Sequence, residues 1–112
     1  MEGATPMEIK HKIWLEKDGS VVFGPGRDDL LKAIEEHHSL HAAAKHLKMS
    51  YRAAWGRLKA SEIRLGIRLV EVDNSKKSGM HLTAEAKKLI DSFDKLDGEI
   101  TSLIHKANAK IK

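Results

Sequence analysis

The residues best suited to chemistry lie in one short stretch, LKMSYRAAWGRLK, at positions 47–59. Within seven residues this stretch places Tyr51, Arg52, Trp55 and Arg57, although aromatic residues make up only 4% of the chain. An arginine can donate two hydrogen bonds to a guanine edge or bind a phosphate, and a tyrosine can contact a phosphate or a thymine methyl. The stretch therefore predicts a surface that binds double-stranded DNA.

Positive charge is concentrated around the same stretch. Residues 45–68 hold seven basic side chains and one acidic side chain, a local net charge of +6 against +4 for the whole chain. The rest of the chain is therefore slightly acidic. Such a concentration is typical of a nucleic-acid-binding surface, although a solvated helix face produces the same pattern.

Metal and catalytic chemistry have weaker support in the sequence. The chain has no cysteine, which excludes disulfides and thiolate metal sites. The histidines of HHSLH, His37, His38 and His41, could share a metal only if they lay on one helix, and Ser39 is expected to begin a new helix between them. No nucleophile-elbow serine is present either. We expect no metal, no cofactor and no enzymatic activity.

Length and hydropathy predict one folded domain outside membranes. The 112 residues are 41% hydrophobic and 32% charged, values typical of a single globular domain. The first residues lack the layout of a signal peptide, and no apolar run approaches the ~20 residues that a membrane span needs. A cytoplasmic protein is therefore expected.

The N-terminal part predicts a β-hairpin and a connector. Residues 9–23 contain two short runs rich in Ile, Trp, Val and Phe around Asp18-Gly19, a dipeptide that favours a tight hairpin turn. Gly24, Pro25 and Gly26 then read as a plain connector. Asp28 can cap or charge the start of a first helix, which is expected to end near His37 or His38.

Two further helices are expected to form a helix-turn-helix. Ser39 and Ser50 are suitable N-caps for a second and a third helix, separated by a short turn at Lys48 and Met49. Helical spacing places two sets of residues inward, in the second helix Leu40, Ala43, Ala44 and Leu47, and in the third Ala54, Leu58 and Ser61.

A wing and a long last helix complete the predicted fold. IRLVEV and MHLT read as strands around the polar turn NSKKSG, whose Lys76 and Lys77 could contact phosphates. Thr83 is a suitable N-cap for a last helix that runs to about residue 107, with Gly98 as a possible bend or end. Its apolar positions alternate spacings of four and three, which favours a helical partner. The residues expected to form a dimer interface are Leu89, Phe93, Leu96, Ile100 and Leu103.

The first turn of the third helix is the predicted site of DNA recognition. Ser50, Tyr51 and Arg52 are expected to reach bases and phosphates, and Arg57 and Lys59 to contact phosphates farther along. Trp55 lies between the inward and outward faces. It could press on the DNA backbone, but tryptophans are more often mostly buried, which favours packing in the core.

The order of these elements resembles the N-terminal DNA-binding domain of the ModE-type molybdate-responsive transcriptional regulators, winged helices related to the LysR-type regulators. The resemblance covers residues 9–104, and its most specific pieces are MSYRAAW and LTAEAKKLI. It implies that Ser50, Tyr51 and Arg52 open the recognition helix and that the last helix forms a homodimer. Full-length members also carry C-terminal oxyanion-binding domains. We therefore expect a stand-alone member or a fragment that does not itself bind molybdate.

The predicted fold is mainly α with small β, a winged helix-turn-helix with an N-terminal β-hairpin and a long C-terminal dimerisation helix. Residues 1–82 would form the DNA-binding unit, and residues 83–112 the dimerisation helix of the same domain. The expected function is sequence-specific DNA binding in transcriptional regulation. A winged-helix module that binds a protein partner, with or without metal at its histidines, is the alternative.

Overall fold

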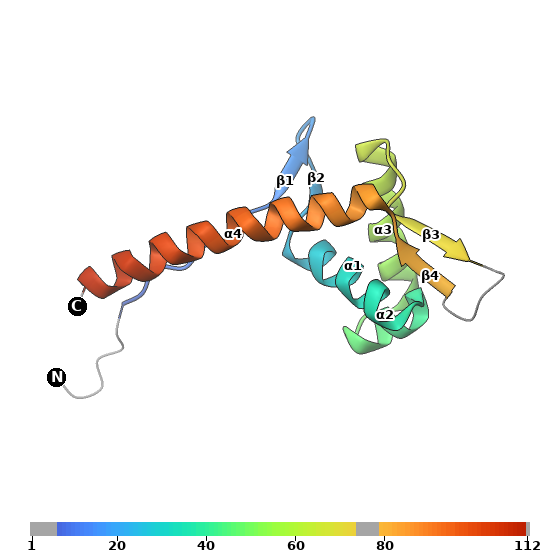
Figure 1. The fold of residues 1–112 in the computed structure, drawn as a ribbon, viewed down its shortest axis with the longest axis horizontal. Helices are drawn as coiled ribbons and strands as arrows, with labels where there is room; N and C mark the ends of the chain where they lie inside the picture. Colours follow the sequence, from blue (N-terminus) through green and yellow to red (C-terminus); the bar gives the residue numbers. More distant parts are fainter. Residues whose placement is uncertain (1–6, 74–78, 112) are drawn as a thin grey trace.

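The computed structural model of the chain describes residues 7–73 and 79–111. Figure 1 shows a small head of helices and hairpins from which one long helix extends. The architecture is a mainly helical winged helix-turn-helix with two small hairpins, as predicted. Its elements in chain order are β1 (Leu15–Lys17), β2 (Ser20–Phe23), α1 (Pro25–His37), α2 (Leu40–His46), α3 (Tyr51–Leu65), β3 (Val70–Asp73), β4 (Gly79–Leu82) and α4 (Ala84–Ile111).

The first hairpin forms around the predicted turn but is shorter than expected. Asp18 and Gly19 both have positive φ angles, 52° and 80°, which a two-residue hairpin turn of type I′ requires. Residues 9–14 are not part of the hairpin. Residues 9–11 run along α4 (Figure 1), where the backbone N–H of Ile9 donates to Asn108 Oδ1 at 2.7 Å and His11 Nε2 lies 2.8 Å from Asp97 Oδ1. Ile13 packs against the core of the head instead.

The first helix begins earlier than the sequence predicted. Pro25 occupies its first turn, and Gly24 is an N-cap without a side-chain hydrogen bond. The connector prediction is therefore wrong for Pro25 and Gly26. Proline suits this position because its φ angle is already helical and its missing N–H has no partner there in any helix. Asp28 places negative charge in the first turn but does not cap it.

The helix-turn-helix formed by α2 and α3 has the predicted caps. Ser39 Oγ accepts from the N–H of Ala42 at 3.1 Å, and Ser50 Oγ accepts from the N–H of Ala53 at 3.0 Å. The inward residues predicted for α3 are all buried: Ala54, Leu58 and Ser61. A serine N-cap therefore stabilises the start of each helix, and an apolar face packs each helix against the core.

The wing consists of β3 and β4, which pair antiparallel from Val70↔Leu82 to Asp73↔Gly79. Both strands were predicted. The turn between them, with Lys76 and Lys77, lies outside the described residues. The core of the head gathers apolar residues from every helix and both hairpins; its most completely buried large side chains are Phe23, Leu30, Leu31, Ile34 and Leu69.

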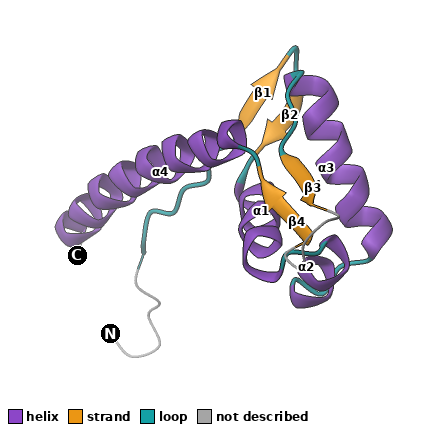
Figure 2. Ribbon diagram, turned by 45° about the vertical axis from the view of Figure 1, so that its right-hand side comes forward, coloured by secondary structure: helices purple, strands orange, loops and turns teal. Residues whose placement is uncertain are grey.

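Helix α4 begins in the core and leaves it (Figure 2). Thr83 Oγ1 accepts from the N–H of Ala86 at 3.1 Å, the predicted N-cap. The buried residues of α4 all lie in its first ten positions, and the last of them, Phe93, packs edge-to-face on Phe23 with ring centroids 5.1 Å apart. The helix continues through Gly98 to Ile111, so Gly98 does not end it. Within the described residues, no helix is long and apolar enough to cross a membrane.

Candidate nucleic-acid interface

Helix α3 turns one face to the core and the other to solvent. Its inward positions Ala54 and Leu58 are nearly inaccessible. Since an α-helix turns by about 100° per residue, Arg52 and Gly56 fall on the opposite side, and both are exposed. The structure thus places the predicted first-turn residues Ser50, Tyr51 and Arg52 together at an open surface.

The side chain of Trp55 is 48% exposed, so the expectation of core packing is wrong. Small Ala54 and branched Leu58 already fill the space against the rest of the head. Trp55 lies one turn beyond Tyr51, which is itself 43% exposed. Two aromatic rings are therefore available on the same flank of α3.

A histidine from α2 supports this flank. The rings of His41 and Tyr51 stack with centroids 3.9 Å apart and an interplanar angle of 13°. The contact holds the Tyr51 ring at the junction of the two helices. In the sequence His41 stood out only as a possible metal ligand, because nine residues lie between it and Tyr51 and only the turn brings them together.

The predicted basic residues of α3 are not equally free. Arg57 is exposed, whereas Lys59 is half-buried and its Nζ lies 3.1 Å from Glu62 Oε1. The other oxygen of Glu62 accepts from the backbone N–H of Leu69 at 2.8 Å. A phosphate at Lys59 must compete with this pair, so Arg57 is the better-placed cation of the two.

Arg57 belongs to a basic cluster with Arg64 of α3 and Arg27 of α1, and nothing in the sequence indicated that Arg27 lies beside α3. Arg27 Nε donates to Ser61 Oγ at 2.6 Å, and Arg64 donates to the backbone oxygen of Val21 at 2.8 Å. Burial, followed by the charges of Arg64 and Arg57, lowers the pKa of Arg27. Arg27 could not be assigned to this cluster from the sequence, because it is far from Arg57 and Arg64 along the chain and only folding brings them together.

A pocket of about 400 Å³ adjoins this cluster, between the first hairpin and the start of α1. Its lining includes Lys12 and Trp14 as well as Arg27 and Arg57. Positive charge therefore extends from α3 toward the first hairpin.

The predicted dimer residues fall into two groups. Phe93 lies inside the core of the head and Leu89 packs partly against it, which corrects the assignment of Phe93 to an open interface. Beyond them, Leu96 and Leu103 are 51% and 65% exposed, and Ile100 is half-buried. The change occurs where α4 leaves the head.

Solved structures share this fold. The chain in the CbnR_DBD-DNA complex superposes with a TM-score of 0.60 at 22% identity, over 78% of this chain and 97% of that one. The BenM_DBD chain in complex with benA site 1 DNA gives 0.58 at 19% identity, over 75% and 91%. CbnR, a LysR family transcriptional regulator, gives 0.58 at 23% identity, over 75% of this chain but only 28% of its own. At these identities the likeness establishes the fold alone.

The family is established by sequence. No curated protein matches the chain. The profile described as "Bacterial regulatory helix-turn-helix protein, lysR family" matches residues 29–87, slightly more than half of the chain and all of α2, α3 and the wing strands. The chain therefore belongs to the LysR family of bacterial regulatory helix-turn-helix proteins, whose members are transcription regulators rather than enzymes.

Proposed function

We propose that this chain binds double-stranded DNA sequence-specifically through the exposed face of α3. The observation that carries the proposal is the first turn of α3, where Tyr51 and Arg52 face solvent while Ala54 and Leu58 anchor the helix to the core. A helix held in this way can enter the major groove, because Tyr51, Arg52 and Gly56 in its first half are exposed to solvent. Membership of the LysR family supports this role, as do the DNA complexes of the structurally similar CbnR_DBD and BenM_DBD.

Different residues of α3 would contact the bases and the phosphates. Arg52 reads a base edge, since a guanidinium can donate two parallel hydrogen bonds to guanine. Ser50, Tyr51 and Trp55 contact the sugar-phosphate backbone or a thymine methyl. The remaining predicted cations neutralise phosphates: Arg57, Lys59, Lys76 and Lys77.

The chain would act as a homodimer joined by α4. Leu96 and Leu103 expose apolar surface on the part of α4 that the head does not cover, and a second α4 could bury it. Two copies of α3 would then enter successive major grooves about 34 Å apart, which requires an inverted repeat in the DNA. On the strength of MSYRAAW and LTAEAKKLI, we assign the chain to the ModE-like branch, without an oxyanion-binding domain in these 112 residues.

The decisive experiment removes the base-reading arginine. Duplexes that bind the chain are first selected from a random pool, and affinities for the selected and a scrambled duplex are then measured for both proteins. Arg52→Ala is expected to weaken binding to the selected duplex by about 1–3 kcal/mol and to narrow the difference between the two duplexes. The control Lys88→Ala removes one charge from an exposed position of α4.

Two results would contradict the proposal. Equal affinities of Arg52→Ala and the unchanged protein for the selected duplex would remove the base-reading role. Absence of binding to any duplex at low salt would favour the protein-interaction alternative. Lys76→Ala serves as a comparison, because loss of a phosphate contact should reduce the salt dependence of binding by about one unit of slope without changing sequence preference.

A further inference from the structure

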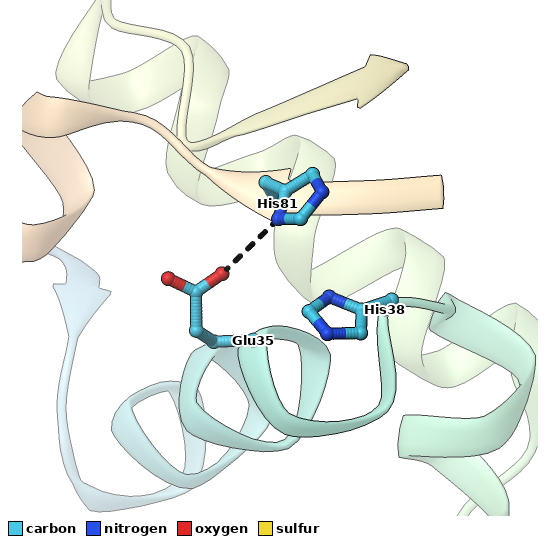
Figure 3. A group of neighbouring side chains, drawn as sticks. All are labelled: Glu35, His38 and His81. Atoms are coloured by element: carbon cyan, nitrogen blue, oxygen red, sulfur yellow. Dashed lines mark ion pairs between the residues drawn. The ribbon is translucent and has the colours of Figure 1, made fainter. Parts of the chain in front are cut away.

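Three potential metal ligands meet on the side of the head where the end of α1 faces β4. Figure 3 shows Glu35 from the last turn of α1, His38 at its C-cap and His81 from β4 pointing toward one another. One donor atom of each lies within 4.8 Å of the other two. We propose that these three side chains bind one divalent transition-metal ion of the zinc type.

The backbone holds the two histidines in position. The N–H of Met80 donates to the carbonyl oxygen of His38 at 2.9 Å. Gly79 makes this approach possible, because a Cβ there would stand 2.6 Å from the same oxygen and its φ of +63° disfavours other residues. The end of α1 and the start of β4 are thus locked together. The rings of His38 and His81 lie with centroids 4.8 Å apart, before any metal is added.

The donor set suits zinc and similar ions. Two imidazoles and one carboxylate form a recurrent three-ligand set that leaves a fourth position to water. Metal–ligand distances of about 2.0–2.2 Å place tetrahedral donors about 3.4 Å apart. Glu35 Oε1 and His81 Nδ1 are already 3.7 Å apart. His38 is exposed, so rotation of its side chain can close the remaining gap.

Other polar groups around Glu35 modulate the site without closing it. Glu35 Oε1 accepts from the N–H of Leu82 at 3.3 Å, a long hydrogen bond that a carboxylate oxygen can share with a metal. Lys87 Nζ lies 3.5 Å from the other oxygen. The ammonium would repel a bound cation, but Lys87 is exposed and can turn to solvent. Removal of this charge should therefore tighten metal binding, although it breaks an ion pair.

The ion would join α1 to the wing strand β4. Binding should raise the melting temperature, because the three donors come together only in the folded chain. This inference does not depend on DNA binding, so it can fail while the proposed function holds, and the reverse.

The test measures zinc binding by the tag-free, chelator-treated chain. Calorimetry is expected to give one zinc ion per chain in the micromolar range or tighter, and cobalt is expected to give a visible absorption band at the same stoichiometry. His81→Gln and Glu35→Gln should each weaken zinc binding roughly tenfold or more, since each removes one ligand. Lys87→Gln should tighten it.

Matched histidine variants decide between this site and nonspecific binding. His105→Gln removes an exposed histidine of α4, and His46→Gln breaks the other histidine pair, in which the rings of His37 and His46 lie 4.9 Å apart. Both should retain full affinity. If His81→Gln fails to fold, His38→Asn replaces it, because asparagine tolerates the left-handed φ of 57° at this position. No zinc binding by the unchanged chain at micromolar concentrations, or full affinity in the ligand variants, overturns the proposal.

Discussion

Helices α3 and α4 both carry an apolar face, but the chain covers these faces to different extents. In α3 the inward residues Ala54, Leu58 and Ser61 are buried along the helix, and the open side mixes arginines with exposed Tyr51, Trp55 and Ile63. In α4 burial ends at Phe93, and apolar side chains continue in the open at Leu96. The rest of the chain therefore covers the inward face of α3 along the helix, whereas it covers the apolar face of α4 only as far as Phe93.

Residues 9–11 cover part of the surface of α4 beyond the head. His11 Nε2 lies 2.8 Å from Asp97 Oδ1, and Asn108 exchanges two hydrogen bonds with the backbone of Ile9. This segment covers one face of the distal helix. Leu96 and Leu103 lie on the adjoining face, seven residues and two turns apart, as in a coiled-coil seam.

The largest effect is expected when this seam is charged. Leu96→Glu combined with Leu103→Glu should abolish the proposed dimer, since a symmetric interface would bury four leucines at about 1.5–3 kcal/mol each, a loss of about 6 kcal/mol or more. Sedimentation equilibrium measures the association directly. Lys95→Glu with Ser102→Glu is the matched control, because it has the same spacing on a face away from the seam. Equal association of both double variants would contradict a role of Leu96 and Leu103 in an interface.

Substitutions in the first ten residues of α4, which the head covers, should change the stability of the single chain and not its association. Phe93→Ala removes a ring that packs on Phe23 and should lower the free energy of unfolding by about 3–5 kcal/mol at every protein concentration. Leu103→Ala should act only through association, so its effect on the melting temperature should depend on concentration. Thermal unfolding over a range of protein concentrations separates the two. A concentration-independent loss in Leu103→Ala would place that residue in the core of the protomer.

An ionic cluster marks the point where α4 leaves the head. Lys32 Nζ lies 2.8 Å from Asp28 Oδ2 and 2.9 Å from Asp94 Oδ2, directly after Phe93. Asp28 is only 5% exposed, and among the described residues its Oδ1 has no hydrogen-bond partner. Burial is the main reason that its pKa is raised, from 3.8 to about 6. Lys32 donates hydrogen bonds to Asp28 and Asp94, and these bonds raise the pKa of Lys32.

The raised pKa of Asp28 predicts a pH dependence with a definite sign. A carboxyl group whose pKa is raised by folding stabilises the folded state when protonated, and this contribution is lost as the pH rises through about 6. Compared with Asp28→Asn, the unchanged protein should therefore lose about 1–3 kcal/mol of stability between about pH 4 and pH 7. Urea unfolding across this range measures the difference. Asp29→Asn, at an exposed neighbouring position, should show no such difference.

The smallest predicted effect compares one glycine from each helix. Gly56 in α3 and Gly98 in α4 both have open space where a Cβ would stand. Replacement by alanine should stabilise either helix by about 1 kcal/mol. Gly56→Ala should in addition weaken DNA binding, because a methyl group would then stand on the face proposed to approach the groove. Unfolding and DNA affinity, measured on both variants, test this; tighter or unchanged DNA binding in Gly56→Ala would place the contact elsewhere on α3.

Features governed by neighbouring residues could be predicted from the sequence. The turn at Asp18-Gly19 and the caps Ser39, Ser50 and Thr83 depend on chemistry within four residues, and all four occur as predicted. Trp55 could not be placed in the same way, because its exposure depends on how closely α3 approaches the rest of the head.

The candidate site was predictable only along α3. Tyr51 and Arg52 follow from helical spacing, because the buried alanine and leucine define the opposite face. Arg27 beside Arg57, and His41 against Tyr51, come from different elements that only the folded chain brings together. No spacing rule could have found them.

The amino-acid sequence alone was enough to predict the turn of the first hairpin, the strands of the wing, the starts of α2, α3 and α4, and the concentration of net positive charge in residues 45–68. These properties are local, since caps, turns and periodicity act over a few residues. The packing of the folded chain places residues 9–11 along α4, brings Phe93 but not Leu103 into the core of the head, and brings Glu35, His38 and His81 together. These contacts join residues far apart in the chain, and they depend on how the elements share a limited core.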